Sequence, residues 1–151
     1  MKAKTPDLWV EFKRAHPKII AMLFYADWYA REQFGHEILL TDVDRTQEGY
    51  DQTYAKDVAG GFCPTFKDRD GKLHYGGFRP HLYDPINGVR SHAGDVGVVH
   101  GTLNQVERLT DKEARQLAAH INEFWPRSDG KPSALYHDTG SGMHLHLQCV
   151  V

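Results

Sequence analysis

Two stretches of the chain carry side chains at helical spacing. The first ends before Gly35, has Pro17 where a first helical turn accepts proline, and repeats along one stripe the residues Ile20, Leu23, Phe24, Trp28, Arg31 and Phe34. The second opens with a capping box at Thr110 and Glu113 and stops at Pro126. Its stripe is Ala114, Leu117, Ala118, Ile121, Phe124 and Trp125. Both segments are predicted to be helices with one face in the core.

Shorter segments have the composition of strands: residues 38–41, 95–99, 133–136 and 145–151. Thr46 is suited to cap a short helix over residues 47–56, in which Tyr50 and Tyr54 stack at i, i+4 as ordinary packing. This order of elements predicts an α+β fold, with a small mixed or antiparallel sheet packed against helices. We expect a single domain over residues 1–151.

Residues 59–89 form a long irregular stretch rich in glycine, proline, aspartate and aromatic residues. Within it, Asp70-Gly71 separates residues 65–67 from residues 73–75, which predicts a hairpin. Because the aromatic residues argue against disorder, we expect an ordered loop that roofs a cleft and sets substrate choice.

Composition narrows the range of partners. The 151 residues are 40% apolar, and 18 Lys and Arg against 20 Asp and Glu give a formal net charge of -2. Because the chain has no excess of positive charge to bind phosphates, a nucleic-acid partner is disfavoured. Small molecules or peptides are the ligands more consistent with this charge. The apolar runs are too short for membrane insertion and no signal core opens the chain, so we expect cytoplasmic synthesis. A cell-wall target would then require release by a separate factor or by lysis; the oligomeric state is not indicated.

The end of the chain carries two histidines in an apolar run, Met143-His144-Leu145-His146-Leu147. Residues i and i+2 of a strand share a face, so both imidazoles point the same way. Burying two imidazoles side by side is costly unless a metal, a substrate or hydrogen-bond partners satisfy their nitrogens. The alternative is that both histidines lie on a polar face of the strand that is exposed to solvent. If the strand that contains Asp95 is adjacent, a carboxylate and two imidazoles meet, which is a ligand set that zinc uses.

Four segments carry a resemblance to a known family. They are Leu40-Thr41-Asp42-Val43-Asp44-Arg45-Thr46, Ala93-Gly94-Asp95, the capped helix from Thr110 to Trp125, and Tyr136-His137-Asp138-Thr139-Gly140 leading into the closing H-x-H. From about Ile38 to its end, the chain resembles zinc peptidases of the D-alanyl-D-alanine carboxypeptidase and dipeptidase type. These include phage peptidoglycan endolysins and share the Hedgehog-like fold, which the resemblance implies here.

The resemblance also implies a zinc site. Asp95 matches the aspartate of the family motif S-x-H-x-x-G-x-A-x-D, and His146 matches the second histidine of the closing pair. The motif's own histidine position falls on Gly88. We favour His81 as the first metal ligand, with residues 82–88 as an insertion. His92 is the alternative, although its three-residue separation from Asp95 leaves little chain to bring both to one ion.

Two catalytic roles follow from the same resemblance. Arg45 takes the position of the arginine that faces substrate, where a guanidinium fixes a carboxylate or an oxyanion. The residues alone favour a surface salt bridge to Asp42 or Asp44, whereas the resemblance favours the substrate-facing role. The family often has an acidic general base three residues before the final histidine, where this chain has Met143. We assign the base role to His144 and interpret Asp138 as a turn residue.

The leading hypothesis is a zinc-dependent metallopeptidase that hydrolyses peptidoglycan stem peptides or D-alanyl peptides through a metal-activated water. One alternative keeps the fold without catalysis, as a module that binds cell wall or serves as a structural or phage component. A third class is an unrelated metal-binding or sensory protein.

Overall fold

The computed structural model describes residues 1–99, 108–139 and 142–150. Its main sheet has five strands in the order β1 (Lys2–Ala3), β2 (Leu39–Asp42), β5 (Ala93–Gly97), β7 (Met143–Gln148) and β6 (Ala134–Asp138). Strand β1 runs parallel to β2, and the other neighbours pair antiparallel. The predicted α+β class and mixed sheet are therefore confirmed. The predicted strands are also present, although β5 and β7 begin two residues earlier than expected.

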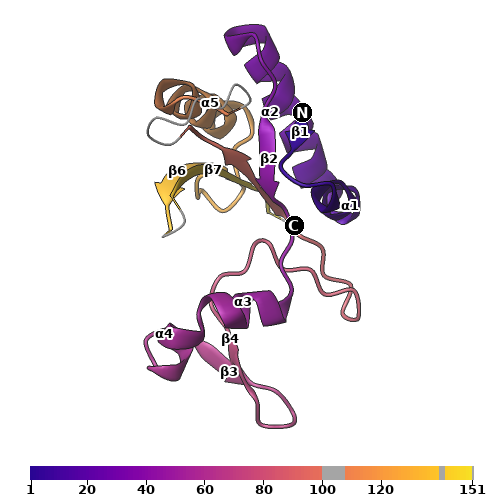
Figure 1. Ribbon diagram of the computed structural model, residues 1–151, viewed down its shortest axis with the longest axis vertical. Helices are drawn as coiled ribbons and strands as arrows, with labels where there is room; N and C mark the ends of the chain where they lie inside the picture. The colour runs from indigo at the N-terminus through magenta and orange to yellow at the C-terminus, as the bar shows by residue number, and fades with distance from the viewer. Residues whose placement is uncertain (100–107, 140–141, 151) are drawn as a thin grey trace.

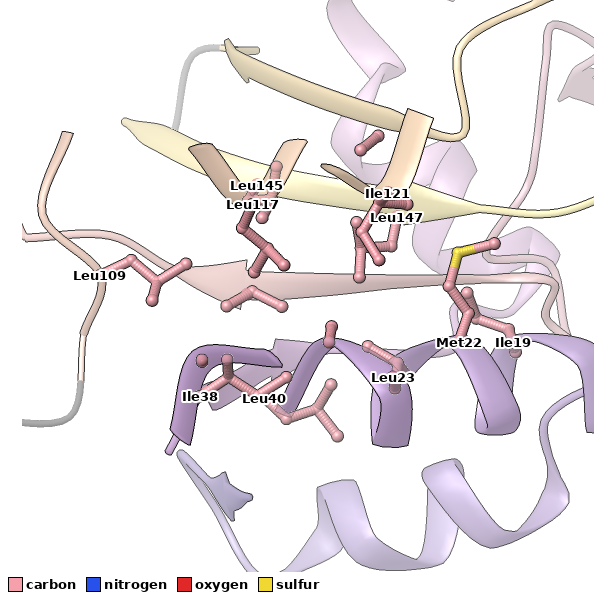
Figure 2. Packing of buried hydrophobic residues seen from close by; sticks show 14 of the residues in the cluster. Ile19, Met22, Leu23, Ile38, Leu40, Leu109, Leu117, Ile121, Leu145 and Leu147 are labelled. Atoms are coloured by element: carbon pink, nitrogen blue, oxygen red, sulfur yellow. The ribbon is translucent and has the colours of Figure 1, made fainter. Parts of the chain in front are cut away.

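Three helices pack on one face of this sheet: α1 (Asp7–Arg14), α2 (Pro17–Phe34) and α5 (Asp111–Phe124). Figure 2 shows side chains of α2 and α5 meeting Leu40, Leu145 and Leu147 of the strands in one apolar layer. The capping box at Thr110 and Glu113 forms as predicted, and Gly35 ends α2 with φ of 75°. No helix within the described residues combines the length and the apolar character that a membrane crossing requires.

The buried face of α2 differs from the predicted stripe. Phe24 and Trp28 are 56% and 53% exposed. The face that meets the core instead consists of Ile19, Met22, Leu23, Ala26 and Ala30. Close approach explains the difference, because a Cβ at Gly94 in β5 would lie only 2.8 Å from Leu23 Cδ1. Small side chains allow this spacing, and large aromatic rings on the same face would prevent it.

A second region, residues 47–78, extends away from the sheet (Figure 1), and we call it the lobe. It contains α3 (Gln47–Thr53), α4 (Ala55–Ala59) and the two-stranded sheet of β3 (Thr65–Lys67) and β4 (Leu73–Tyr75). The predicted hairpin and the Thr46 cap are confirmed. The single helix predicted over residues 47–56 is instead two, because Tyr54 leaves the helical conformation. The Tyr54 ring stacks on that of Tyr75, and the Tyr50 ring is stacked near both.

Candidate metal centre

The face of the sheet opposite the helices carries the residues of interest. Leu145 and Leu147 are fully buried in the core, so the alternate positions of β7, His144 and His146, point to the other face. Asp95 of β5 pairs directly with His146 across the antiparallel ladder. The adjacency on which the predicted site depended is therefore present, and it is set by strand pairing.

His81 reaches the same place from the segment that follows the lobe. Its backbone carbonyl accepts a hydrogen bond of 2.6 Å from the Arg45 N–H, and its own N–H donates to the Tyr50 hydroxyl at 3.0 Å. These bonds fix the backbone of His81 beside the end of β2. The side chain is buried, with the whole residue only 5% exposed.

The side chains of His81, Asp95 and His146 converge. His146 Nδ1 lies 2.8 Å from Asp95 Oδ1, and His81 Nε2 lies 3.3 Å from His146 Nδ1 and 3.4 Å from Asp95 Oδ1. Among the described residues, this is the one group of at least three histidine, cysteine or acidic side chains whose donor atoms all lie within 4.8 Å of one another. We call these three residues the triad.

Hydrogen bonds on the outer side of each ring fix which nitrogen faces inward. His81 Nδ1 donates to the Val43 carbonyl at 2.8 Å. His146 Nε2 lies 3.2 Å from Gln148 Oε1, and the amide orientation of Gln148 is set because its Nε2 donates to the Pro132 carbonyl. In the neutral rings, His81 Nε2 and His146 Nδ1 are therefore unprotonated. Two nitrogen lone pairs and a carboxylate oxygen face one another in a buried site.

The triad fits a tetrahedral zinc ion. With zinc–ligand bonds of about 2.0–2.1 Å, two ligands of a tetrahedron are about 3.3–3.4 Å apart. The two distances from His81 Nε2, 3.3 and 3.4 Å, agree with this separation. The third, 2.8 Å between His146 and Asp95, is the length of a hydrogen bond and would widen slightly around an ion. Histidine ligands with fixed outer hydrogen bonds are the usual arrangement at such centres.

The electrostatics of the triad also favour a positive charge. Burial raises the pKa of Asp95, but the hydrogen bonds that His146 and His81 donate when their rings are protonated outweigh it and hold that pKa well below its usual range. Burial lowers the pKa of His81, but its hydrogen bond with Asp95 and the charge of that carboxylate shift it upward overall. An ionised carboxylate thus attracts either a proton or a cation to the space between the three donor atoms.

A cavity of about 170 Å³ opens onto the triad. His144 and Arg45, the two predicted catalytic residues, both line it. So do side chains of the lobe and of the segment after it, Tyr50, Tyr54, Phe78 and Pro80. Of the predicted roof over residues 59–89, only the stretch from Phe78 to His81 lines this cavity, and the hairpin does not.

Arg45 forms the predicted salt bridge and also lines the cavity. Its Nη2 donates to Asp42 Oδ2 at 2.9 Å, so the predicted salt bridge is present. Asp44, the other candidate partner, pairs with Arg14 instead, at 2.6 Å. The guanidinium also lies 5.1 Å from the centre of the Tyr50 ring and remains part of the cavity wall.

His144 and Asp138 differ in their relation to the triad. His144 Nδ1 donates to the Gly142 carbonyl at 3.0 Å, which leaves Nε2 unprotonated in the neutral ring, 3.9 Å from Asp95 Oδ2. Asp138 is exposed at the end of β6, and its Oδ1 accepts a hydrogen bond from the Gly142 N–H. The Asp138 carboxylate is thus engaged by the backbone at Gly142, while Gly140 of the predicted turn lies outside the described residues.

Of the two histidines considered as first metal ligand, His81 belongs to the cluster that could hold an ion, and His92 does not. His92 has no donor atom in the triad, and burial lowers its pKa to about 4. Its backbone is engaged in strand-like bonds to Pro80 and Cys149. Gly88, where the family motif has its histidine, sits in a turn with φ of 69°. Reciprocal backbone hydrogen bonds between Asp84 and Val89 close that turn, so residues 84–89 form a compact loop.

Three residues of the site were not predicted from the sequence. Gln148 orients His146, Tyr50 orients His81, and His137 lines the cavity with its ring 4.9 Å from that of His144. Gln148 lies two residues after His146 and hence on the same strand face, a signal present in the sequence. The contact of Tyr50 with His81 spans 31 positions and has no local signal.

Neither a family model, nor a curated protein, nor a solved structure matches the chain. The case for a function therefore depends on the geometry of the site and on the residues that carry the resemblance.

Proposed function

We propose that the protein is a zinc-dependent peptidase that hydrolyses D-alanyl peptides or peptidoglycan stem peptides, with a Hedgehog-like, D,D-peptidase-like fold. The convergence of His81, Asp95 and His146 in a buried cluster is the observation that carries this proposal. These three side chains would hold zinc, which when bound acidifies a water molecule and polarises a carbonyl group. Two histidines and one carboxylate form a ligand set found in catalytic zinc peptidases, because it leaves a further coordination position open.

His144 is the group to which we assign proton transfer. Its Nε2 faces the triad with a free lone pair, since Nδ1 is committed to the Gly142 carbonyl. A neutral imidazole in that tautomer accepts a proton at Nε2 and returns it to the leaving amine. No acidic side chain is needed at position 143 if His144 has this role.

Arg45 is the group to which we assign substrate orientation. One of its nitrogens bonds to Asp42, which fixes the direction of the guanidinium, and other donors remain for a ligand. A fixed guanidinium binds a carbonyl or carboxylate oxygen of the peptide at low entropic cost. The aromatic side chains of Tyr54 and Phe78 give another part of the cavity wall an apolar character.

The decisive experiment measures zinc and turnover in the same samples. Protein purified without a histidine tag is expected to carry one zinc per chain and to release D-alanine from an acetylated peptide that ends in D-alanyl-D-alanine. His146→Ala should lose both zinc and turnover. His92→Ala is the matched control, since His92 lies close by but contributes no donor atom, and it should retain the metal. Full zinc content in His146→Ala would exclude the proposed centre.

A binding module that holds zinc without hydrolysis is the second candidate. It is favoured by Met143, which has no proton-accepting group where the family often has an acid. One zinc per chain with no release of D-alanine, in the same assay, would support this second function over the first.

A further inference from the structure

A separate cavity of about 330 Å³ lies where α2, the end of α5 and the end of β7 come together. Its apolar lining comes from Met22 of α2, from Trp125 and Pro126 after α5, and from Cys149 and Val150 after β7. We call this cavity the α2–α5 pocket. No described residue lines both this pocket and the cavity that opens onto the triad, so the two are distinct places in the molecule.

Polar side chains complete the lining of the α2–α5 pocket. Lys18 in the first turn of α2 and Arg127 after α5 both line it, together with the hydroxyl side chains of Ser128 and Ser133. None of the described residues that line the pocket is acidic. A ligand that suits this lining has an apolar body and one group that accepts hydrogen bonds from cations.

Asp129 fixes the direction of the Arg127 guanidinium. Arg127 Nε and Nη2 donate to the two carboxylate oxygens of Asp129 at 2.9 and 2.5 Å. A turn holds the two residues together, because the Gly130 N–H donates to the Arg127 carbonyl and the Lys131 N–H donates to Asp129 Oδ1. Since the carboxylate occupies the edge formed by Nε and Nη2, the Nη1 group points away from Asp129.

Arg127 Nη1 lacks the partner that its position calls for. The Arg127 side chain is only 7% exposed, and Nη1 is the one buried side-chain nitrogen or oxygen of the described residues without a hydrogen-bond partner. Buried donors in folded proteins nearly always have an acceptor, and a charged donor loses most when it has none. An acceptor held in the pocket that Arg127 lines would supply the missing hydrogen bond.

Lys18 adds a second positive charge at this pocket. Its Nζ donates to the Val150 carbonyl at 3.0 Å, a neutral acceptor, and no carboxylate of the described residues forms an ion pair with it. Burial raises the pKa of the Cys149 thiol, and the charges of Lys18 and Arg127 oppose this rise, so both charges act on the same side chain of the lining. Because Asp129 balances Arg127, the charge of Lys18 remains, which suits a ligand with a single negative charge.

We propose that the α2–α5 pocket binds a small carboxylic acid with an apolar body, whose carboxylate accepts hydrogen bonds from Arg127 Nη1 and Lys18 Nζ. Such bonds are charge-assisted, and the apolar body would be buried against Met22, Trp125 and Pro126. A phosphate group would bring a second negative charge, which the pocket does not match. This inference is independent of the proposed function, because it uses no residue of the triad or of its cavity.

Titrations of the full chain followed by two-dimensional NMR test the pocket. Three probes are compared: hexanoate, hexanamide, which lacks the charge, and acetate, which lacks the apolar body. Hexanoate should bind at least about tenfold more tightly than either of the others, because of its charged hydrogen bonds and its buried methylene groups. The amide signals of Cys149 and Val150 should shift, whereas those of Asp95 and His144 should not.

Two variants assign the preference for the acid to its residues. Arg127→Gln and Lys18→Met should each reduce the preference for hexanoate over hexanamide severalfold and leave the affinity for hexanamide within about twofold. Arg115→Gln is the matched control and should change nothing, because Arg115 also pairs with an aspartate but lies outside the pocket. If Arg127→Gln does not fold, Lys18→Met decides alone, since Lys18 is exposed.

Binding of hexanoate to a metal at the triad is distinguished by His146→Ala, which should keep the wild-type affinity for hexanoate. The inference is overturned if hexanoate binds no more tightly than hexanamide, if both folded variants keep the wild-type preference, or if binding is lost in His146→Ala. A preference that either variant reduces, with shifts at Cys149 and Val150, supports the pocket whether or not the protein releases D-alanine.

Discussion

The sheet with its helices and the lobe are stabilised in different ways. In the sheet region, Leu40, Val96, Leu145 and many neighbours are fully buried in one cluster. In the lobe, all of whose residues are described, Tyr50 alone is buried, and Phe62 is 85% exposed. Polar contacts hold the lobe instead, with His74 bonded to Asp51 at 2.6 Å and to Asp68 at 2.8 Å.

This difference bears directly on the triad. Asp95 and His146 belong to paired strands of the sheet, so the apolar core fixes their positions. His81 lies where the two regions meet: its ring bonds to Val43 beside the sheet, and its backbone bonds to Tyr50 of the lobe. The core thus provides a rigid pair of ligands, and the lobe helps to position the third. Rigid support for a site with an adaptable wall is what the proposed peptidase would need in order to admit a peptide.

The largest contrast is expected from truncating one leucine in each region. Leu145→Ala removes a fully buried side chain and should lower the free energy of unfolding by about 3 kcal/mol, from lost burial and the cavity left behind. Leu73→Ala in the lobe, at a side chain 39% exposed, should cost less than about 1 kcal/mol. Urea denaturation measures both, and similar losses would contradict the comparison.

The second largest effect is expected from removing, in each region, one hydrogen bond that orients a proposed metal ligand. Gln148→Leu removes the acceptor for His146 Nε2–H and should weaken zinc binding by about 10- to 100-fold. Tyr50→Phe removes the acceptor for the backbone N–H of His81 and should weaken it by less than about tenfold, because the ring keeps its bond to Val43. Competition with a zinc chelator gives both affinities. A larger loss of zinc affinity in Tyr50→Phe than in Gln148→Leu would mean that the affinity depends more on the lobe than on the sheet.

Local signals and contacts between distant residues were predictable to different degrees. The Thr110 capping box, the Gly35 end of α2 and the Asp70-Gly71 hairpin are encoded by neighbouring residues, and the sequence predicts them correctly. The prediction of the buried face of α2 was wrong. Which face is buried depends on how closely the helix approaches Gly94, and no local sequence pattern reveals that distance.

The residues of the candidate site were likewise predictable to different degrees, depending on whether local sequence or distant contacts place them. The shared face of His144 and His146 follows from strand alternation alone. That Asp95 lies opposite His146 follows from sheet order, which the sequence leaves open and which the resemblance supplied as an expectation. His81 stands 14 positions before Asp95 and reaches it only because the chain loops out at Gly88. Spacing arguments fail at such a loop, since its length does not fix where its ends lie.

A smaller difference in stability is expected when one threonine N-cap is removed from each region. Thr110→Ala removes the N-cap of α5, which packs on the core, and should lower the free energy of global unfolding by about 1 kcal/mol. Thr46→Ala removes the equivalent bond to Gly49 at the start of α3. It should leave global unfolding unchanged and increase only local opening of the lobe, seen as faster hydrogen exchange of α3 amides. Equal effects on global unfolding would mean that lobe and core unfold as one unit.

The smallest expected effect is a pH dependence confined to the lobe. Hydrogen bonds with Asp68 and Asp51 raise the pKa of His74 above its ordinary value of 6.5. Because the folded pKa is the higher one, the contribution of protonated His74 is fully present below pH 6.5 and is lost as the pH rises through the raised pKa. The hydrogen bond with His74 lowers the pKa of Asp68. Burial raises the pKa of Asp51, but hydrogen bonds from Gln47, the Tyr75 N–H and His74 outweigh it and lower that pKa. The contribution of these two carboxylates is lost only as the pH falls through their lowered pKa values.

Hydrogen exchange of the β3 and β4 amides should therefore show more protection at about pH 5.5 than at about pH 8.5, after correction for intrinsic exchange rates. The amides of β5 and β7 serve as the internal reference, because the apolar contacts that hold them do not titrate in this range. His74→Gln should remove the difference between the two pH values in the hairpin. If β5 and β7 lose protection in parallel with the hairpin, the lobe is not stabilised separately from the core, and the triad depends on a single cooperative structure.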